Sequence, residues 1–571
     1  MVEDKNDNTV VPNAFRRRFP FSEIRPVQGE ILDLLDKIYS MEKYRYIVIE
    51  AGTGIGKSAI AKAIAGVENR THVLTATKQL QDQYEAFDDG TVAIIKGQSN
   101  YKCAVDTEVR CSSGPCKFGD KGLRYKCYGA GKCPYNSARA KAEAAPTSVT
   151  SYAYFLSQTM REATVAKLTR DAIIIDECHL LEDQLISFAG FSLSAERLDK
   201  RFDIVEGADL TLEEIALFHR TIREPGYDAN IAWIDVVKAL LQRRSENMKD
   251  TMTRLNGDRY TMTADELQEL NKIDKRKLGY KIDDIDNLIE KIDLFRTSKH
   301  RKTWLINVVD DGLKVEPLDI EKLFNAYIGR FARKHVIFMS ATILNQPEFC
   351  RDIGLTPENT AIIVKQSTFD PYRSPIVDMC VGSMSYRNLA STMPEIIRAI
   401  EEILARHKGQ KGIIHTSTYN IANHIVQSIN SKRFISSLDG LSNEEMLRYH
   451  QATSSGTVLV SPSMMTGVDL EGDLARFQII VKMPFASMKD PRIKTKMEIN
   501  KTWYLTKMMR NFVQACGRGT RSDGDWSVTY VLDSYFPNFI FDNRKYLGRQ
   551  FSSRVVTESQ FNYKEFLKRV K

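Results

Sequence analysis

The 571-residue sequence has no long apolar run, few cysteines and no internal repeat. No segment approaches the run of about 18 apolar residues that a membrane helix needs, so a membrane-spanning protein is not expected. The first residues, MVEDKNDN, are acidic and polar, which does not match a secretory signal. Nine cysteines are too few to form a disulfide scaffold in so long a chain. We therefore expect a cytoplasmic protein.

Length and composition indicate an enzyme of several domains. The chain exceeds what one hydrophobic core usually serves, and its 43% hydrophobic and 27% charged residues are ordinary for a globular protein. A net charge of +8 is a mild excess that many soluble enzymes share. The positive charge is concentrated, because ten Lys or Arg residues against three acidic residues lie between Lys96 and Lys141. This stretch also holds five of the cysteines.

Short β-branched apolar runs recur along the chain and predict buried parallel strands. The runs are YRYIVIEAG, THVLTAT, TVAIIKG, DAIIIDE, KHVIFMSAT, KGIIHTST, GTVLVSPS, FQIIVKMPF and WSVTYVLD. Helix-like segments separate most of them, and the candidate active residues follow strand ends, which is where doubly wound sheets bind ligands. The pattern predicts an α/β fold with two parallel sheets, one up to about Ala341 and one after about Pro375, joined by a proline-rich linker.

Two stretches interrupt the first predicted sheet. One is rich in Gly, Lys and Cys, and the other has the helical spacing of Ile285, Leu288, Ile289 and Ile292 and a capping-box pattern at Thr263 and Glu266. We expect the second stretch to be a mostly helical insertion. The predicted domains are a first lobe at residues 1–96, 142–183 and 331–345, a cysteine-rich insertion at 97–141, a helical insertion at 184–330 and a second lobe at 346–571.

The segment AGTGIGKS follows a predicted strand directly and precedes a predicted helix. Glycines let main-chain N–H groups approach a phosphate, and the helix N-terminus adds a favourable dipole. Lys57 is placed to reach the β and γ phosphates, and Ser58 is placed to bind Mg²⁺. The residues expected to contact ATP here are Ala51, Gly52, Thr53, Gly54, Ile55, Gly56, Lys57 and Ser58.

A second strand, DAIIIDECH, ends in acidic residues and supplies the other half of an ATPase site. Asp176 is placed to hold Mg²⁺, usually through water, and Glu177 to orient and deprotonate the attacking water. We expect His179 to couple this site to the neighbouring lobe rather than to bind a metal. Cys178 is expected to be a buried small residue.

The five clustered cysteines predict a metal or cluster site. They are separated by 7, 4, 10 and 5 residues, with no C-x-x-C pair and no His between Gly97 and Lys141. Four thiolates can hold a four-iron cluster or zinc, and this spacing is unlike that of zinc ribbons. An unligated group of thiols among so many lysines would have lowered pKa values and oxidise readily. The lysines also offer phosphate contacts, and Tyr101, Tyr125 and Tyr128 could stack on bases.

Taken together, these motifs resemble the superfamily 2 helicases of the XPD and DinG branch. Besides DECH, the resemblance lies in RPVQ at residues 25–28, TATKQLQDQ at 75–83, SAT at 340–342, STFDPYRSP at 367–375, TGVDLEG at 466–472 and QACGRGTR at 514–521. It spans nearly the whole chain and implies two RecA-like lobes. The cysteine-rich flanks KGQSNYKC and KCPYNSARAKA resemble the cluster domain of the DinG type.

The resemblance also implies roles for single residues. Arg518 and Arg521 would be arginine fingers and Gln514 would contact the phosphates or the water, while Gln28, Gly467 and Asp469 would also line the nucleotide site. The cluster ligands would be Cys103, Cys116, Cys127 and Cys133, with Cys111 as the substitute candidate. The chain departs from the branch pattern at Thr466, where a Glu is usual, and after Asp533, where an Arg is common.

The sequence thus predicts an ATP- and Mg²⁺-dependent DNA helicase with a 4Fe-4S cluster that moves 5′ to 3′ on single-stranded and forked DNA, as a monomer. The segment around Thr77, Lys78 and Gln79 would hold the strand backbone. Alternatives are a translocase or remodeller on DNA or RNA that does not unwind, or a metal-binding scaffold with a decayed ATPase. The complete set of Lys57, Asp176, Glu177 and Arg521 argues against decay. DNA repair, recombination and phage replication would all use these motifs, a bacterial or phage source is expected, and no exonuclease domain is expected before the phosphate loop.

Overall fold

The computed structural model describes residues 13–87, 89–116, 133–160, 165–219, 227–257, 262–298, 303–309, 312–464, 470–519 and 524–570. The chain divides into two compact units. Unit 1 comprises Met1–Ile64, Phe338–Arg351 and Thr356–Lys571, and unit 2 comprises Ala65–Ile337 and Asp352–Leu355.

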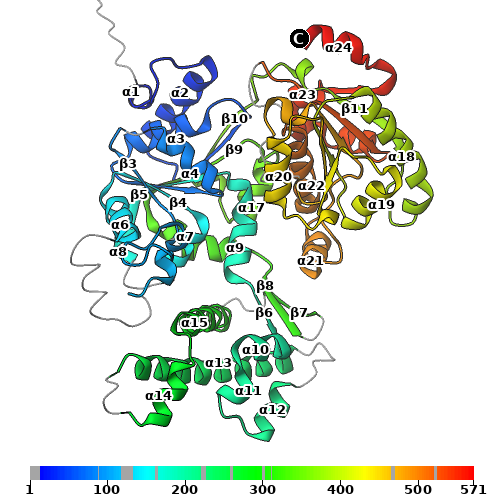
Figure 1. Cartoon of the computed structure of the whole chain (residues 1–571). Coiled ribbons are helices and arrows are strands. Elements are labelled where there is room, and N and C mark those ends of the chain that lie inside the picture. The colour runs from blue at the N-terminus through cyan, green and yellow to red at the C-terminus, as the bar shows by residue number, and fades with distance from the viewer. Residues whose placement is uncertain are drawn as a thin grey trace, which may run out of the picture. The chain divides into compact units, whose positions relative to one another are not determined.

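The first sheet has seven strands in the order β10-β1-β9-β5-β2-β4-β3 (Figure 1). The strands are β1 (Tyr46–Ala51), β2 (Thr71–Thr75), β3 (Val92–Ile95), β4 (Thr147–Ser151), β5 (Arg170–Asp176), β9 (Ala332–Ser340) and β10 (Thr360–Lys365). The pairings of β1 with β10, β2 with β4 and β5, and β3 with β4 are parallel. Strands β1, β2 and β5 are buried along their whole length, as in sheets that helices cover on both faces. The five apolar runs that predicted strands here are confirmed.

Two strands of this sheet were not predicted. Strand β4 has the sequence TSVTS, which lacks an apolar run, and its hydroxyls are buried because they find partners, as when Thr150 Oγ1 donates to the carbonyl of Ile95 at 3.0 Å. Strand β10 pairs with β1 from Tyr46↔Thr360 to Ala51↔Lys365. The chain therefore returns to the first sheet within the range 346–375 that the sequence analysis had placed outside it.

The second sheet also has seven strands, in the order β13-β14-β12-β15-β16-β11-β17. They are β11 (Ile376–Gly382), β12 (Gly412–His415), β13 (Phe434–Ser436), β14 (Val458–Ser461), β15 (Phe477–Ile480), β16 (Val528–Asp533) and β17 (Val555–Thr557). All neighbouring strands pair in parallel. The four remaining apolar runs are confirmed as β12, β14, β15 and β16, and so is the prediction of an α/β chain with two parallel sheets.

Amphipathic helices accompany the second sheet. Helix α18 buries Ile396, Ile400 and Ile403 at helical spacing against a core that includes Ile414 and Val460 of the sheet. The helices of unit 1 are α1 (Ala14–Arg17), α2 (Pro26–Ser40), α17 (Gln346–Asp352), α18 (Leu389–Arg406), α19 (Tyr419–Ile429), α20 (Asn443–Ala452), α21 (Pro491–Ile499), α22 (Lys501–Cys516), α23 (Phe536–Ser552) and α24 (Tyr563–Val570), and α3 (Lys57–Val67) begins there.

Unit 2 carries the helices that lie between β2 and β9 in sequence. They are α4 (Lys78–Glu85), α6 (Pro134–Ala144), α7 (Tyr152–Thr159), α8 (Val165–Leu168), α9 (Leu181–Ala189), α10 (Ala195–Phe202), α11 (Ile204–Gly207), α12 (Leu212–Phe218), α13 (Tyr227–Leu255), α14 (Ala264–Asn271), α15 (Lys275–Thr297) and α16 (Glu321–Tyr327). A small antiparallel sheet, which was not predicted, consists of β6 (Phe191–Ser194), β7 (Trp304–Val309) and β8 (Gly312–Pro317) in the order β6-β8-β7.

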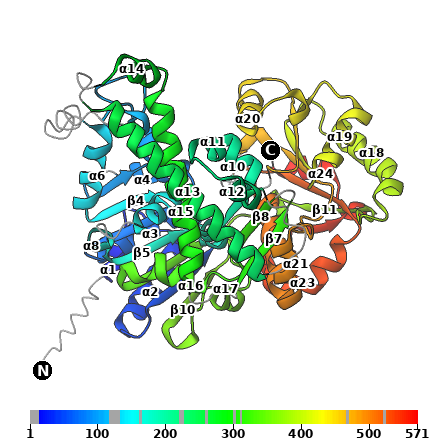
Figure 2. The same ribbon diagram turned by 90° about the horizontal axis from the view of Figure 1, so that it is seen from below.

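The two longest of these helices, α13 and α15, lie side by side (Figures 1 and 2). Their contact explains the apolar spacing seen in the sequence, because Ile285 and Ile292 of α15 are fully buried. The predicted capping box at the start of α14 is present, since the Thr263 side chain accepts from the Glu266 N–H and the Glu266 carboxylate accepts from the Thr263 N–H. The stretch 184–330 contains helices α10 to α16 and the small antiparallel sheet, and its role as an insertion stays a prediction.

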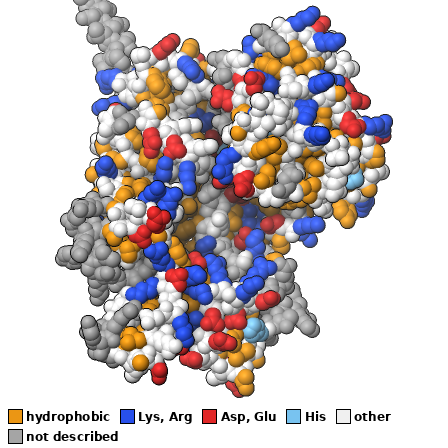
Figure 3. All heavy atoms as spheres, in the orientation of Figure 1, with side chains coloured by type: hydrophobic (Ala, Val, Ile, Leu, Met, Phe, Trp, Pro, Cys, Tyr) orange, Lys and Arg blue, Asp and Glu red, His pale blue; other side chains and the backbone are white. Residues whose placement is uncertain are grey.

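The surface shows no segregation of charge on the face that Figure 3 presents, where Lys and Arg side chains are interspersed with Asp and Glu. Within the part of the chain that the structure describes, no helix combines the length and the apolar character needed to cross a membrane.

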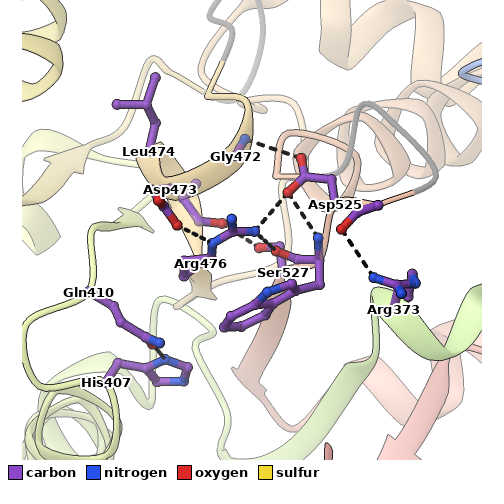
Figure 4. A network of polar contacts seen from close by, with 12 residues as sticks. Arg373, His407, Gln410, Gly472, Asp473, Leu474, Arg476, Asp525 and Ser527 are labelled. Atoms are coloured by element: carbon purple, nitrogen blue, oxygen red, sulfur yellow. Dashed lines mark hydrogen bonds and ion pairs between the residues drawn. The ribbon is translucent and has the colours of Figure 1, made fainter. Parts of the chain in front are cut away.

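A polar network ties together two loops of the second sheet (Figure 4). Arg476 directly precedes β15. It donates from Nη1 to Asp525 Oδ1 at 2.7 Å and from Nε to Asp473 Oδ1 at 2.7 Å. Asp525 Oδ2 also accepts from the Gly472 N–H at 3.1 Å, and Arg373 donates to the carbonyl of Gly524 at 3.1 Å. Because Gly472 ends the TGVDLEG motif and Gly524 closely follows QACGRGTR, the network braces the ends of both motif segments.

Removal of either carboxylate that contacts Arg476 should lower the free energy of unfolding by a different amount, because the two differ in burial. The Asp525 side chain is 3% exposed and that of Asp473 is 93% exposed. We expect Asp525→Ala to lower the free energy of unfolding by about 3 kcal/mol, because it leaves a largely buried guanidinium without its inner partner. The matched control Asp473→Ala should lower it by less than about 1 kcal/mol. Urea denaturation followed by circular dichroism measures both, and equal losses would contradict the assignment of Asp525 as the main brace.

Candidate nucleotide site and cysteine-rich site

The loop between β1 and α3 has the backbone shape that phosphate binding needs. Gly54 and Gly56 have φ values of 85° and 87°, a left-handed conformation that glycine adopts without strain. Helix α3 begins at Lys57, so the N–H groups of its first turn and the positive end of its dipole lie at the loop. Lys57 and Ser58 are both partly exposed. The loop therefore combines accessible main-chain donors with a lysine.

Side chains from two other segments support this loop. Gln28 is 5% exposed and donates from Nε2 to the carbonyl of Ile55 at 2.7 Å. Arg25 Nη1 donates to the carbonyl of Gly54 at 2.8 Å. On the other side, Ser367 Oγ donates to the carbonyl of Thr53 at 2.9 Å. These contacts occupy loop carbonyls, while two loop N–H groups also have partners, Gly52 N–H at the carbonyl of Lys365 (3.0 Å) and Ile55 N–H at that of Gly52 (3.4 Å).

Glycine is required in the loop for space as well as for conformation. A Cβ atom added to Gly52 would lie 2.3 Å from the main-chain nitrogen of Ser367, and one added to Gly54 would lie 2.1 Å from the ring of Phe369. Ser367 and Phe369 belong to the STFDPYRSP segment, so that segment packs directly on the phosphate loop.

In unit 2, the acidic end of β5 holds its aspartate by three contacts. Asp176 is 2% exposed, and its Oδ1 accepts from the Glu177 N–H at 3.0 Å while its Oδ2 accepts from the Tyr84 hydroxyl at 3.3 Å. Its carbonyl accepts from the Tyr152 hydroxyl at 2.8 Å. The first two bonds restrain the carboxylate and the third holds the main chain at the same residue.

The residues that follow Asp176 are constrained too. Glu177 has a φ of 52°, which is uncommon for a residue with a side chain and often marks a functional site. Its Oε2 lies 3.3 Å from Nδ1 of His179, which is 5% exposed in its side chain. Cys178 is fully buried, as predicted. His179 thus contacts the residue predicted to activate water.

Helix α22 meets the SAT motif within unit 1. Gln514 Nε2 donates to Thr342 Oγ1 at 2.9 Å, which brings together two residues predicted from separate motifs. Further along the same helix, Thr506 Oγ1 lies 3.5 Å from Asn345 Nδ2. At the N-cap of the helix, Asn500 Nδ2 donates to Glu348 Oε1 at 2.6 Å. A row of polar contacts therefore joins α22 to the segment 342–348.

Glu50, in strand β1 next to the phosphate loop, anchors the same segment. Its carboxylate accepts from the Leu344 N–H at 3.0 Å and from the side-chain amide of Gln346. Burial raises the pKa of Glu50, although these hydrogen bonds and the charge of Arg510 oppose the rise. Leu344 has a φ of 67°, a strained conformation that the Glu50 contact helps to hold. The SAT segment is thereby connected to β1 and, through Arg510, to α22.

Arg518 lies just beyond α22 and is 9% exposed. Burial, with a smaller contribution from the Arg518 charge, lowers the pKa of His415 to about 4, so His415 is neutral at pH 7. The other residues predicted for this side of the nucleotide site, Arg521, Gly467 and Asp469, lie outside the described residues. Their roles stay predictions.

The cysteine-rich stretch places three thiols in buried positions. Cys103, Cys111 and Cys133 are 4%, 8% and 7% exposed, and Cys111 and Cys133 share one apolar cluster with Tyr135. Cys103 Sγ lies close to the main chain of this stretch, 3.2 Å from where a Cβ on Gly114 would be. Cys116 is half-buried, and Cys127 lies outside the described residues.

The pKa of the Cys111 thiol is shifted in the opposite direction from the one expected from the sequence. Burial, and after it the proximity of Cys133, raises the pKa of the Cys111 thiol to about 11, whereas neighbouring lysines were expected to lower it. Desolvation outweighs the attraction of distant ammonium groups. Among the described residues, no three His, Cys, Asp or Glu side chains converge on a point where they could hold a single metal ion.

Three residues that matter to these sites were not found by sequence reasoning. Tyr84 and Glu50 reach their partners only through sheet packing, and Asp525 closes a network whose other members are distant in sequence. A buried charge at the end of the apolar strand YRYIVIE was the one signal available for Glu50.

Comparisons with known proteins find helicases. A family model described as "Helicase C-terminal domain" matches residues 400–553, and the DEAD_2 model matches residues 116–198. An ATP-dependent DNA helicase YoaA of Haemophilus influenzae is 24% identical over 79% of this chain and 81% of the relative. A probable ATP-dependent helicase of Methanocaldococcus jannaschii is 21% identical over 92% of this chain and 94% of the relative.

Solved structures share the fold. One titled "XPD_Helicase" has a TM-score of 0.63 at 14% identity and covers 94% of this chain and 100% of that chain. Another, titled "Structure of S. tokodaii Xpd4", has a TM-score of 0.59 at 14% identity, with 93% and 100% covered. The order of motifs, the two parallel sheets and these matches agree with one another. The chain is thus a distant relative of ATP-dependent DNA helicases, matches the DEAD_2 and helicase C-terminal domain models, and shares the fold of the XPD structures.

Proposed function

We propose that the protein is an ATP-dependent DNA helicase. The observation that carries the proposal is the loop between β1 and α3, whose bare glycine backbone, helix N-terminus and Lys57 suit a triphosphate. The relatives named as ATP-dependent DNA helicases match along four fifths of the chain, which supports DNA as the nucleic acid.

In this proposal ATP binds with Mg²⁺, and the cation offsets charge on the phosphates. Lys57 and the loop N–H groups hold the phosphates, and Ser58 and Asp176 are the residues that would hold the cation. Glu177 orients the attacking water and accepts its proton, while His179 Nδ1, 3.3 Å from its carboxylate, restrains it. The hydrogen bonds from the Tyr84 hydroxyl and the Glu177 N–H restrain its carboxylate, and the bond from Tyr152 holds its main-chain carbonyl.

Two arginines supply further positive charge at the phosphates in this proposal. Arg518 and Arg521 stabilise the charge that develops on the transferred phosphoryl group. Gln514 contacts the SAT segment by donating a hydrogen bond to Thr342. Since α22 is joined by polar contacts to residues 342–348, a shift of the arginine-bearing segment is passed to β1 through Glu50. Hydrolysis is thereby linked to movement.

A variant of the proposed base separates binding from hydrolysis. We expect Glu177→Gln to lower kcat for ATP hydrolysis by at least about 100-fold, because the amide cannot accept the proton from water. The affinity for a fluorescent ATP analogue should change little, as the phosphate contacts remain. Glu213→Gln, an exposed position in α12, serves as the matched control and should keep the wild-type rate. A Glu177→Gln enzyme with more than a tenth of the wild-type kcat would assign the base elsewhere.

We further propose that residues 97–141 hold a 4Fe-4S cluster. Cys103, Cys133 and Cys127 supply three ligands, and the fourth is Cys111 or Cys116. The buried position of Cys111 beside Cys133 favours Cys111, although the family spacing pointed to Cys116. The cluster's negative charge would be offset by the lysines and arginines of the same stretch.

The iron content of cysteine variants tests the ligand set. Anaerobically purified Cys103→Ser, Cys133→Ser and Cys111→Ser should lose most of their iron and acid-labile sulfide, since each removes a thiolate ligand. Cys116→Ser should retain both at near the wild-type level and Cys380→Ser, an exposed cysteine far along the chain, is the control. Loss of iron in Cys116→Ser with retention in Cys111→Ser would restore Cys116 as the fourth ligand. A wild-type protein without iron would refute the cluster.

The proposed direction of movement is 5′ to 3′, with the cysteine-rich stretch 97–141 and the helical stretch 184–330 acting on the strand. Single-stranded DNA would run along the first lobe at Thr77, Lys78 and Gln79, of which Lys78 and Gln79 are exposed. The alternatives remain an ATP-driven translocase or remodeller that does not unwind, and an RNA-directed motor. They differ from the helicase in the products they give on tailed duplexes.

Tailed duplexes separate these alternatives. With ATP and Mg²⁺, we expect displacement of the labelled strand from a duplex with a 5′ tail and little from one with a 3′ tail, because movement starts on the single strand and proceeds in one direction. Gel electrophoresis of the released strand measures this, and a matching RNA duplex is the control for substrate class. Displacement only from the 3′ tail would reverse the polarity. ATP hydrolysis without displacement from either duplex would favour the translocase.

A further inference from the structure

Helix α4 presents two different faces within two turns. Thr77 is its N-cap and accepts from the Leu80 N–H at 3.3 Å, and the following Lys78 and Gln79 are exposed. On the opposite face, Gln81 and Tyr84 are each 1% exposed. Residues three apart share a helix face, so the sequence TKQLQDQY encodes both an outward polar turn and an inward pair.

The inward pair ends at the predicted cation site. The Tyr84 hydroxyl donates to Asp176 Oδ2 at 3.3 Å, although the two residues are 92 positions apart. The Tyr84 ring packs edge-on against Phe87, with ring centroids 6.1 Å apart, which leaves the ring little freedom. A phenylalanine would fill the same space, so the hydroxyl has a purpose beyond packing. Its partner is the carboxylate that the proposed function assigns to the cation.

The hydrogen bond from Tyr84 to Asp176 comes from a side chain that is distant in sequence. The Glu177 N–H comes from the next residue, and the Tyr152 hydroxyl meets the main-chain carbonyl. Tyr84 thus reaches the carboxylate from a separate helix. Groups that hydrogen-bond to a metal-binding carboxylate orient it and tune its affinity, and their removal costs about 10- to 100-fold in metal affinity.

We propose that Tyr84 is a positioning residue that makes the cation affinity of Asp176 depend on helix α4. Lys78 and Tyr84 are six residues apart, which is about 9 Å along a helix. A strand seated on the exposed N-terminal turn therefore acts on the same short rigid element that holds the Asp176 carboxylate. The inference rests on the proposed function for both the cation at Asp176 and the strand at α4.

The variant Tyr84→Phe removes the hydroxyl and keeps the ring. The first readout is binding of Mn²⁺, as an EPR-visible substitute for Mg²⁺, to the full chain with a non-hydrolysable ATP analogue. We expect Tyr84→Phe to weaken Mn²⁺ binding about 10-fold. The second readout is the factor by which a single-stranded oligonucleotide changes Mn²⁺ affinity, which should fall toward one in the variant. The control is Tyr504→Phe, which removes a hydroxyl that donates to the carbonyl of Ala486 at 2.9 Å.

The outcomes distinguish this inference from the function on which it rests. If the wild-type protein does not bind Mn²⁺ with the nucleotide, or does not hydrolyse ATP, the proposed function fails and no variant is needed to show it. If the wild type binds Mn²⁺ and Tyr84→Phe matches it within twofold, the positioning role is overturned while the function stands. An equal loss in Tyr504→Phe, or an oligonucleotide effect that Tyr84→Phe retains in full, also overturns it.

Discussion

The main chain of the loop after β1 has to be accessible to a phosphate, and several side chains of unit 1 support the loop in that conformation. Phosphate binding through N–H groups requires glycines in left-handed conformations, as at Gly54 and Gly56, and nearby side chains that take the loop carbonyls instead. Arg25 and Gln28 do so from α2, and Ser367 does so from the segment after β10. The packing of Phe369 on Gly54 shows how little space remains for any other residue.

Buried carboxylates extend this arrangement beyond the loop. Glu50 holds the strained Leu344 and so attaches the SAT segment to β1, and Asp525 joins the ends of two motif segments through Arg476. Both are charged groups in low-dielectric surroundings, where a satisfied network is rigid and a broken one is costly. In unit 2, Asp176 is fixed in the same manner by hydroxyl and N–H donors.

Much of the fold could be predicted because apolar β-branched runs are a direct sign of buried parallel strands. All nine such runs became strands, whereas TSVTS of β4 was missed because its buried residues are hydroxyls with tertiary partners. The return of β10 to pair with β1 depends on the path of the chain after Ser340, which no local pattern encodes. Motif order predicted Lys57, Asp176 and Gln514, but Tyr84 is an ordinary helix residue until folding places it on Asp176. The raised pKa of Cys111 was likewise missed, because burial is not visible in a lysine-rich sequence.

The central claim is that this chain is a motor driven by ATP and engaged by single-stranded DNA. The most direct measurement is phosphate release by the wild-type protein with Mg²⁺ and ATP, with and without a single-stranded DNA oligonucleotide. We expect slow hydrolysis alone and a rise of about tenfold or more with DNA, because strand binding orders the groups that stabilise the transition state. A rate that is zero under both conditions, or equal under both, would contradict it.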